Sequence, residues 1–277
     1  MKKCIIIGDY CDDTLVCQEL RSAIGGFVKD LTFIQISFVH SNPSTIHTAF
    51  LLSQIVQTEE RYGKPQETII FVNTDPRIES TVGVRESEGA RGIIIKLVSG
   101  IWVTGPNAGF DFSLIKDKID AAYTYSGLEK GSQFRSRDRY PRVIAHLMDY
   151  MEDDLQLDEI EANVIPELHG LFVGHIDNYG NIKTTITVDD LKGKYEHGDT
   201  LEVEIHGTIH KARYVDNLFG GNVGELVMYP GSSGKPDNAY LEISAWSHFG
   251  DSKNSDAAGT GKDFFQGAKP GMKIILT

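Results

Sequence analysis

The sequence predicts two domains: an α/β domain with a mostly parallel or mixed sheet in residues 1–158, and an all-β barrel or sandwich in residues 159–277. In the first half, short apolar runs alternate with stretches of helical periodicity, which is the pattern of βαβ units. In the second half, short strands are separated by glycine, asparagine and aspartate, with no long helical stretch between them. The acidic segment "EDDLQLDEIE" between the halves is typical of a solvated boundary.

The first half begins with "KKCIIIGDY", a continuous apolar run that is typical of a buried parallel strand ending in polar residues. A helix follows in "DDTLVCQELRSAIGGF", then a strand in "LTFIQISFV". The next helix follows Ser44 or Thr45, either of which can cap it. Further strands and a helix are predicted in the segments "ETIIFVNTDPR", "RGIIIKLVSG", "IWVTGPNAGF" and "RDRYPRVIAHLMDYMED". The strand segments predicted after residue 170 are "LFVGHI", "IKTTITV", "TLEVEIHG", "TIHKARYV", "GELVMYP", "AYLEISAW" and "MKIILT".

Composition and charge narrow the class of partner. The formal net charge of −12 argues against broad binding to nucleic acid or to an anionic membrane, since both need clustered lysine and arginine. No run approaches the roughly twenty apolar residues of a spanning helix, so we expect a cytoplasmic protein with a small-molecule ligand. The three cysteines are odd in number and lack a CxxC pair, which favours free thiols over a disulfide or a zinc site. The scattered histidines, including His169, His175, His206 and His210, also favour no metal.

Polar residues at predicted strand ends are the first candidates for a site. In an open α/β sheet, ligands bind at the C-terminal ends of strands. Asp9 follows the first strand, Asp75 lies in "NTDPR" after the third, and Asn107 lies in the "GPNAG" loop. A carboxylate can accept two hydrogen bonds from a ribose diol, although Asp9 is equally well placed to cap the following helix. Neither a GxGxxG nor a GxxxxGK[ST] signature is present.

Two turn segments of the second half carry the other candidates. The hairpin "GHIDNYGNIKTTI" has Asp177, Tyr179 and Asn181 at its tip, more hydrogen-bonding groups than a tight turn needs. They indicate either a binding surface or simply a solvated turn. The glycine-rich "GSSG" carries Ser232 and Ser233 and is typical of a loop between strands that can still contact a ligand.

These segments together resemble the S-adenosylmethionine (SAM) hydroxide adenosyltransferase family, which includes the fluorinating and chlorinating SAM enzymes. The hairpin is similar to the family's His-Ile-Asp-x-Phe-Gly-Asn-Leu-x-Thr-Asn-Ile, and "GSSG…YLEIS" resembles its Gly-Ser-x-Gly-Tyr-Leu-Glu-Ile. The segments "VHSNPSTIHTAFLL", "FVNTDPR", "VTGPNAGF" and "FRSRD" resemble, in that order, the family's His-x-x-Pro-Pro, Val-Val-Asp-Pro-Gly, Gly-Pro-Asp-Asn-Gly and Phe-His-Gly-Arg-Asp.

The resemblance implies a homotrimer that binds SAM between the α/β domain of one subunit and the β domain of its neighbour. It implies that Asp177 and Asn181 hydrogen-bond SAM, that Tyr179 packs against it, and that Asp9 holds the ribose hydroxyls. The implied reaction is attack by water or hydroxide on the ribose C5′ of SAM, which releases methionine and leaves adenosine. A neutral leaving group needs no general acid, so the site must mainly orient the nucleophile.

The family orients the nucleophile with an aspartate, an arginine and a histidine, and this chain matches the set incompletely. Asp75 stands at the aspartate and Arg91 at the arginine, with Arg85 or Arg77 as substitutes, while Arg135 stands where the motif has histidine. An arginine cannot act as a base but can fix an anion. From the resemblance as a whole we expect a SAM hydrolase. The incomplete match leaves three alternatives: a catalytically silent SAM or adenosine binder, a halide-using adenosyltransferase, or a protein-interaction domain without a pocket.

Overall fold

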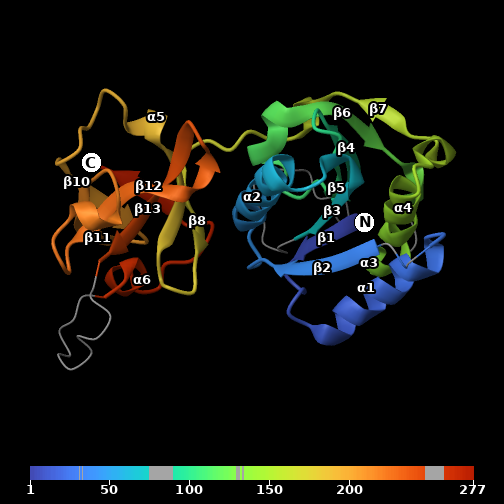
Figure 1. Ribbon diagram of the computed structural model, residues 1–277, viewed down its shortest axis with the longest axis horizontal. Helices are drawn as coiled ribbons and strands as arrows, with labels where there is room; N and C mark the ends of the chain where they lie inside the picture. The colour runs from blue at the N-terminus through green and yellow to red at the C-terminus, as the bar shows by residue number, and fades with distance from the viewer. Residues whose placement is uncertain (31, 33, 75–89, 129–131, 133, 247–258) are drawn as a thin grey trace. The chain divides into compact units, whose positions relative to one another are not determined.

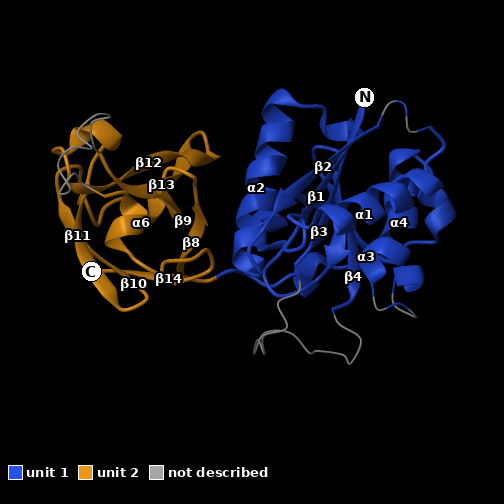
Figure 2. Ribbon diagram, turned by 90° about the horizontal axis from the view of Figure 1, so that it is seen from below, with its two compact units in different colours: residues 1–168 blue, residues 169–277 orange. Residues whose placement is uncertain are grey.

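The computed structural model describes the chain except for residues 31, 33, 75–89, 129–131, 133 and 247–258. It consists of two compact units, Met1–Leu168 and His169–Thr277, which are coloured separately in Figure 2. The boundary expected between residues 158 and 159 falls inside strand β7 (Asp158–Ile160). Because β7 pairs with β6 of the first sheet, that unit extends to Leu168.

The first unit is built on a mixed sheet with the strand order β2-β1-β3-β5-β4-β6-β7. The strands before β7 are β1 (Lys2–Gly8), β2 (Ile34–His40), β3 (Thr68–Asn73), β4 (Gly92–Leu97), β5 (Trp102–Pro106) and β6 (Ile119–Thr124). The neighbours from β2 to β5 are parallel, whereas β4, β6 and β7 add antiparallel pairs. The predicted α/β domain with a mixed sheet is confirmed.

Helices cover both faces of this sheet, as Figure 1 shows. One face packs against α1 (Thr14–Phe27) and α4 (Tyr140–Met148), and the other against α2 (Thr45–Tyr62). The apolar runs of the strands are continuous because both faces are buried. The short helix α3 (Arg135–Asp138) precedes α4, and 3₁₀ turns lie at Pro65–Glu67, Ser113–Lys118, Ser126–Leu128, Glu152–Leu155 and Ala162–Val164.

Side-chain caps define where the two long helices begin. The Asp13 carboxylate accepts hydrogen bonds from the backbone N–H groups of Leu15 and Val16, so Asp13 and not Asp9 caps α1. Ser44 caps α2 by accepting from the N–H of His47. Each cap satisfies backbone donors that a helix start leaves unpaired.

The second unit is a closed barrel with the strand order β10-β11-β12-β13-β9-β8-β14. Its strands are β8 (Leu171–Ile176), β9 (Ile182–Thr187), β10 (Thr200–Ile205), β11 (Thr208–Tyr214), β12 (Leu226–Lys235), β13 (Asn238–Ala245) and β14 (Lys273–Leu276). The short helices α5 (Val188–Leu191) and α6 (Gly261–Phe264) and a 3₁₀ turn at Leu218–Gly220 lie between strands. Of the two predicted architectures, barrel or sandwich, the barrel is the one formed, because β14 pairs with both β8 and β10.

Candidate functional site

The C-terminal edge of the parallel strands collects three of the predicted site residues. Asp9 follows β1 and Asn107 follows β5. Strand β4 runs antiparallel to β5, so that Arg91, which precedes β4, lies at the same edge. The backbone N–H of Asn107 donates to the carbonyl of Arg91 at 2.8 Å, which ties the two strand ends together.

A buried hydroxyl network fixes the end of β3 at this edge. Ser41, Thr48 and Thr74 are fully buried, and their hydroxyl oxygens lie 2.7–3.0 Å from one another. They join the segment after β2, helix α2 and the segment after β3. The network therefore holds the residue that immediately precedes the predicted catalytic aspartate. The residues of this prediction that lie outside the described part of the chain are Asp75, Arg77 and Arg85.

Asn107 presents an oriented hydrogen-bond acceptor. Its Nδ2 donates to the carbonyl of Val164 at 3.0 Å, which fixes which way the amide points. Its Oδ1 is buried and accepts no hydrogen bond from any residue that the structure describes. A buried acceptor without a donor costs about 1–3 kcal/mol, so a ligand that supplies a donor here recovers that free energy.

Helix α3 brings Arg135 to this edge. The Nδ2 of Asn73, the last residue of β3, donates to the Oγ of Ser136 in α3. The ring of Phe134 packs edge-on against Tyr10, which follows β1, with 6.2 Å between ring centroids. Arg135 lies between these two contacts and is partly exposed. Asp9, Arg91, Asn107 and Arg135 thus belong to one edge of one sheet.

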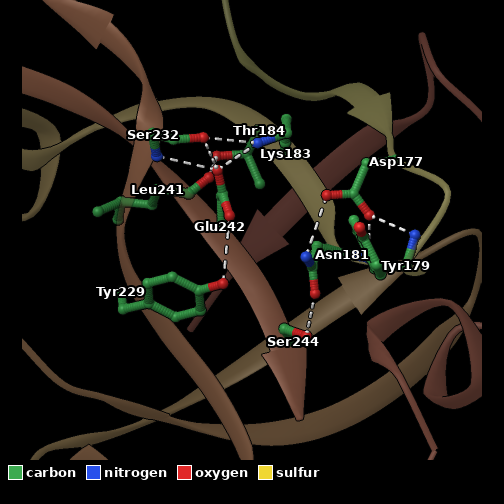
Figure 3. A network of polar contacts seen from close by, with 10 residues as sticks. All are labelled: Asp177, Tyr179, Asn181, Lys183, Thr184, Tyr229, Ser232, Leu241, Glu242 and Ser244. Atoms are coloured by element: carbon green, nitrogen blue, oxygen red, sulfur yellow. Dashed lines mark hydrogen bonds and ion pairs between the residues drawn. The ribbon is translucent and has the colours of Figure 1, made fainter. Parts of the chain in front are cut away.

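In the barrel, the hairpin between β8 and β9 uses most of its polar atoms internally (Figure 3). The Oδ1 of Asp177 accepts from the N–H groups of Tyr179 and Asn181 at 2.9 and 3.0 Å, and its Oδ2 accepts from the Asn181 side chain at 3.0 Å. The hydroxyl of Ser244 donates to the Oδ1 of Asn181. Asp177 and Asn181 therefore shape the turn, while the Tyr179 ring, 75 % exposed, is left as a contact surface.

A buried carboxylate that the sequence argument missed organises the segment with the two predicted serines. Glu242 on β13 is 5 % exposed, and its Oε1 accepts from the N–H and the hydroxyl of Ser232 at 3.0 and 3.1 Å. The same carboxylate forms an ion pair with Lys183 of β9 and accepts from the Tyr229 hydroxyl at 3.2 Å. Ser232 is exposed and Ser233 is buried. A glutamate inside the apolar run "AYLEISAW" was the signal for this network, which Figure 3 shows.

Two titratable side chains beside this network, Tyr229 and His175, have pKa values that differ from their usual ones. Burial, together with the Glu242 charge, raises the pKa of Tyr229, so its phenol stays protonated and donates. Burial, followed by the Lys183 ammonium, lowers the pKa of His175, which favours the neutral imidazole.

The barrel histidines His169, His197 and His206 are exposed, while His210 packs against aromatic rings. His210 lies between the rings of Phe264 and Phe265, with centroids 5.4 and 5.2 Å away. Among the described residues, no group of three or more His, Cys, Asp or Glu side chains is arranged to hold a metal ion. In the same part of the chain, every helix is too short or too polar to cross a membrane.

Comparison with known proteins finds a matching family model for part of the barrel and a curated relative. The sequence model described as "SAM hydroxide adenosyltransferase C-terminal domain" matches residues 172–246, which span the hairpin and the Glu242 network. A curated protein of Methanocaldococcus jannaschii named (R)-S-adenosyl-L-methionine hydrolase is 27% identical over 207 residues, covering 69% of each chain. Over residues 172–246 the chain is thus similar to the C-terminal domain of the SAM hydroxide adenosyltransferases. The resemblance indicated by the motifs is confirmed, at low identity.

Solved structures extend the similarity to the fold of both units. An uncharacterized conserved protein from Thermotoga maritima aligns with a TM-score of 0.71 at 18% identity, covering 99% of this chain and 100% of the other. A conserved hypothetical protein from Thermus thermophilus aligns with a TM-score of 0.66 at 18% identity, covering 100% of both chains. At this identity the similarity concerns the fold alone.

Proposed function

We propose that this protein transfers the adenosyl group of SAM to water, producing adenosine and methionine. The observation that carries the proposal is the family match over residues 172–246, because it covers both barrel segments that the sequence singled out. The name of the M. jannaschii relative, a SAM hydrolase, supports the same reaction. The edge of the first sheet adds an independent set of polar groups suited to a nucleoside.

The reaction needs little acid–base chemistry. The water oxygen forms a bond to the ribose C5′ while the C5′–S bond breaks and its electron pair stays on sulfur. The sulfonium becomes a neutral thioether, and the proton lost by water passes to solvent or to a nearby base. The site must therefore hold C5′ and the water in line and limit competing solvent.

The described groups suit different parts of such a substrate. Asp9 does not cap α1, and its carboxylate is suited to accept from the two ribose hydroxyls. The buried Oδ1 of Asn107 is suited to accept from an amino or hydroxyl group. Tyr179 offers an exposed ring for packing against the adenine or the ribose. Asp75 and Arg91 are proposed to orient the water.

The reaction is tested by incubating the purified protein with SAM in water enriched in ¹⁸O. Adenosine that carries ¹⁸O at its 5′ oxygen, formed in equal amount with methionine, would establish transfer to water. SAM binding measured by calorimetry without any product would instead identify a silent SAM-binding protein. If the protein neither binds SAM nor turns it over, the proposal is overturned and a protein-interaction role remains.

We further propose a homotrimer in which the first unit of one subunit and the barrel of a neighbour share each substrate. Mixing two impaired variants, assayed at a SAM concentration where each alone has little activity, tests this arrangement. Asn107→Leu damages the first unit and Tyr179→Ala damages the barrel, so a mixed trimer would contain some sites built from two intact halves. Activity recovered after the two variants are unfolded and refolded together supports sharing. Recovery no greater than for each variant alone contradicts it, and light scattering gives the oligomeric state.

A further inference from the structure

Arg135 is a cation with no counter-charge among the described residues. Within that part of the chain, its guanidinium takes part in no hydrogen bond or ion pair, although the side chain is partly buried. Arg137, two residues later on the same short helix, pairs with Asp138 at 2.7 Å and with Glu19 at 3.4 Å. A guanidinium has five donors and stays charged at any physiological pH. Arg135 is therefore equipped to receive an anion, whereas Arg137 is already neutralised.

Two residues that differ from the quoted family motifs hold Arg135 in its position. Asn73 stands where "Val-Val-Asp-Pro-Gly" has its first valine, and Ser136 stands where "Phe-His-Gly-Arg-Asp" has glycine. These two departures are hydrogen-bonded to each other. They adjoin the third departure, Arg135 in place of histidine. A helix of four residues is too short to hold its own position, so this contact and the Phe134–Tyr10 packing hold it.

A second buried donor, the hydroxyl of Tyr140, is influenced electrostatically by Arg135. Tyr140, the first residue of α4, is 1 % exposed, and its hydroxyl has no hydrogen-bond partner among the described residues. A Cβ added to Gly92 would lie 2.9 Å from that hydroxyl, which places it under the start of β4. Burial raises the pKa of Tyr140, and the positive charge of Arg135 partly opposes this rise. The phenol is therefore a protonated donor within the electrostatic reach of the guanidinium.

We propose that Arg135, held in place by the Asn73–Ser136 hydrogen bond, binds a singly charged anion at the C-terminal edge of the first sheet. This inference rests on the proposed function, because that function supplies the two candidate sources of the anion. The anion is either the carboxylate of the substrate or a small inorganic ion such as chloride. In the second case chloride can itself attack C5′: a C–Cl bond forms, the C5′–S bond breaks, and methionine leaves with the electron pair.

Anion binding is tested first without SAM. Chloride is the probe, and the line width of its ³⁵Cl NMR signal is followed as the protein is added. We expect the wild type to broaden the line more than Arg135→Met does. Arg137→Met, which removes the same charge from a paired guanidinium, should broaden it as the wild type does. Equal broadening by the wild type and Arg135→Met would overturn the proposal, whatever the protein does with SAM.

The source of the anion is tested with SAM and with decarboxylated SAM. If the substrate carboxylate is the ligand, the wild type should bind SAM about tenfold to a hundredfold more tightly than decarboxylated SAM. Arg135→Met should lose that preference. If chloride is the ligand, chloride should change turnover or produce 5′-chloro-5′-deoxyadenosine, and only when Arg135 is present. Turnover by Arg135→Met with unchanged preference and unchanged chloride response would overturn the proposal while the hydrolase function stands.

The positioning role of Ser136 is tested by a double-mutant cycle. Ser136→Ala removes the hydroxyl and should weaken the Arg135-dependent chloride broadening, whereas Ser136→Thr should retain it. In the Arg135→Met background the same alanine substitution should have no further effect. An equal effect in both backgrounds would mean that Ser136 acts only on folding, and the positioning role would be abandoned.

Discussion

Removing the Glu242 carboxylate should destabilise the barrel more than any surface charge change. The carboxylate is 5 % exposed and accepts hydrogen bonds from Ser232 and Tyr229. Its ion-pair partner Lys183 has a side chain only 14% exposed. Glu242→Ala leaves that ammonium buried without its counter-charge, with only the Ser232 hydroxyl at 2.9 Å as a hydrogen-bond partner, and breaking a buried pair on one side costs about 3–5 kcal/mol. Glu202→Ala is the matched control, because its pair with Lys211 is solvated and contributes about 0–1 kcal/mol.

The two tryptophans make the assay specific for the barrel. Trp102 lies in the first sheet and Trp246 follows β13. In a Trp102→Phe background, urea unfolding followed by tryptophan fluorescence reports on the barrel alone. With a slope of about 1–3 kcal/mol per molar urea, the Glu242→Ala midpoint should fall by at least about 1 M. A midpoint shift no larger than that of Glu202→Ala would refute the reasoning.

A double substitution separates the lone charge from the lost packing. Lys183→Met together with Glu242→Leu removes both charges and fills the space with apolar atoms. Replacing a buried ion pair in this way is often neutral or stabilising, so the midpoint should recover most of the loss. A double variant as unstable as Glu242→Ala would place the cost in the hydrogen bonds to Ser232 and Tyr229 instead.

The remaining predictions concern other sites. Gly105→Ala should destabilise the first unit by about 1–3 kcal/mol, since its Cβ would lie 2.1 Å from the Val72 carbonyl oxygen. Gly26→Ala, where the Cβ in α1 meets nothing within 4 Å, should stabilise the first unit by about 0.5–1 kcal/mol, and both glycine variants are measured by urea unfolding with Trp102 fluorescence in a Trp246→Phe background. Below pH 6.5 His175 is protonated in the unfolded chain but stays mostly neutral in the folded protein, where its pKa is lowered. The free energy of unfolding should therefore decrease as the pH is lowered, and it should decrease less in His175→Asn. Asn107→Leu should raise the Kd for SAM about tenfold to a hundredfold by calorimetry, and an unchanged Kd would remove it from the site.

Several features were readable from the sequence because they depend on neighbouring residues. The apolar run of β1 predicted a strand buried on both faces, and both cores receive its side chains. Ser44 was one of two predicted caps and is the one observed. The glycine and asparagine turns correctly separated most barrel strands, but the loop predicted at "GSSG" was wrong, since Ser232 and Ser233 lie within β12, where the pairing with β13 shifts register between Pro230 and Gly234. The grouping of Asp9 and Asn107 also followed from a rule about strand ends, which needs only strand order and direction, whereas Arg91 was assigned through the family resemblance.

Other features depend on residues that meet only in the folded chain. The choice of a barrel over a sandwich rests on β14 pairing with β8, a contact between the two ends of the unit. The Asn73–Ser136 hydrogen bond joins residues 63 positions apart, and the Glu242 network joins three strands. The sequence indicated the long helices and most strands, since periodicity and caps are local, but it did not predict β6 and β7. Tertiary structure alone decided that Asp177 serves its own turn and that, within the described residues, Glu242 is paired and Arg135 is not, because partners are chosen by long-range packing.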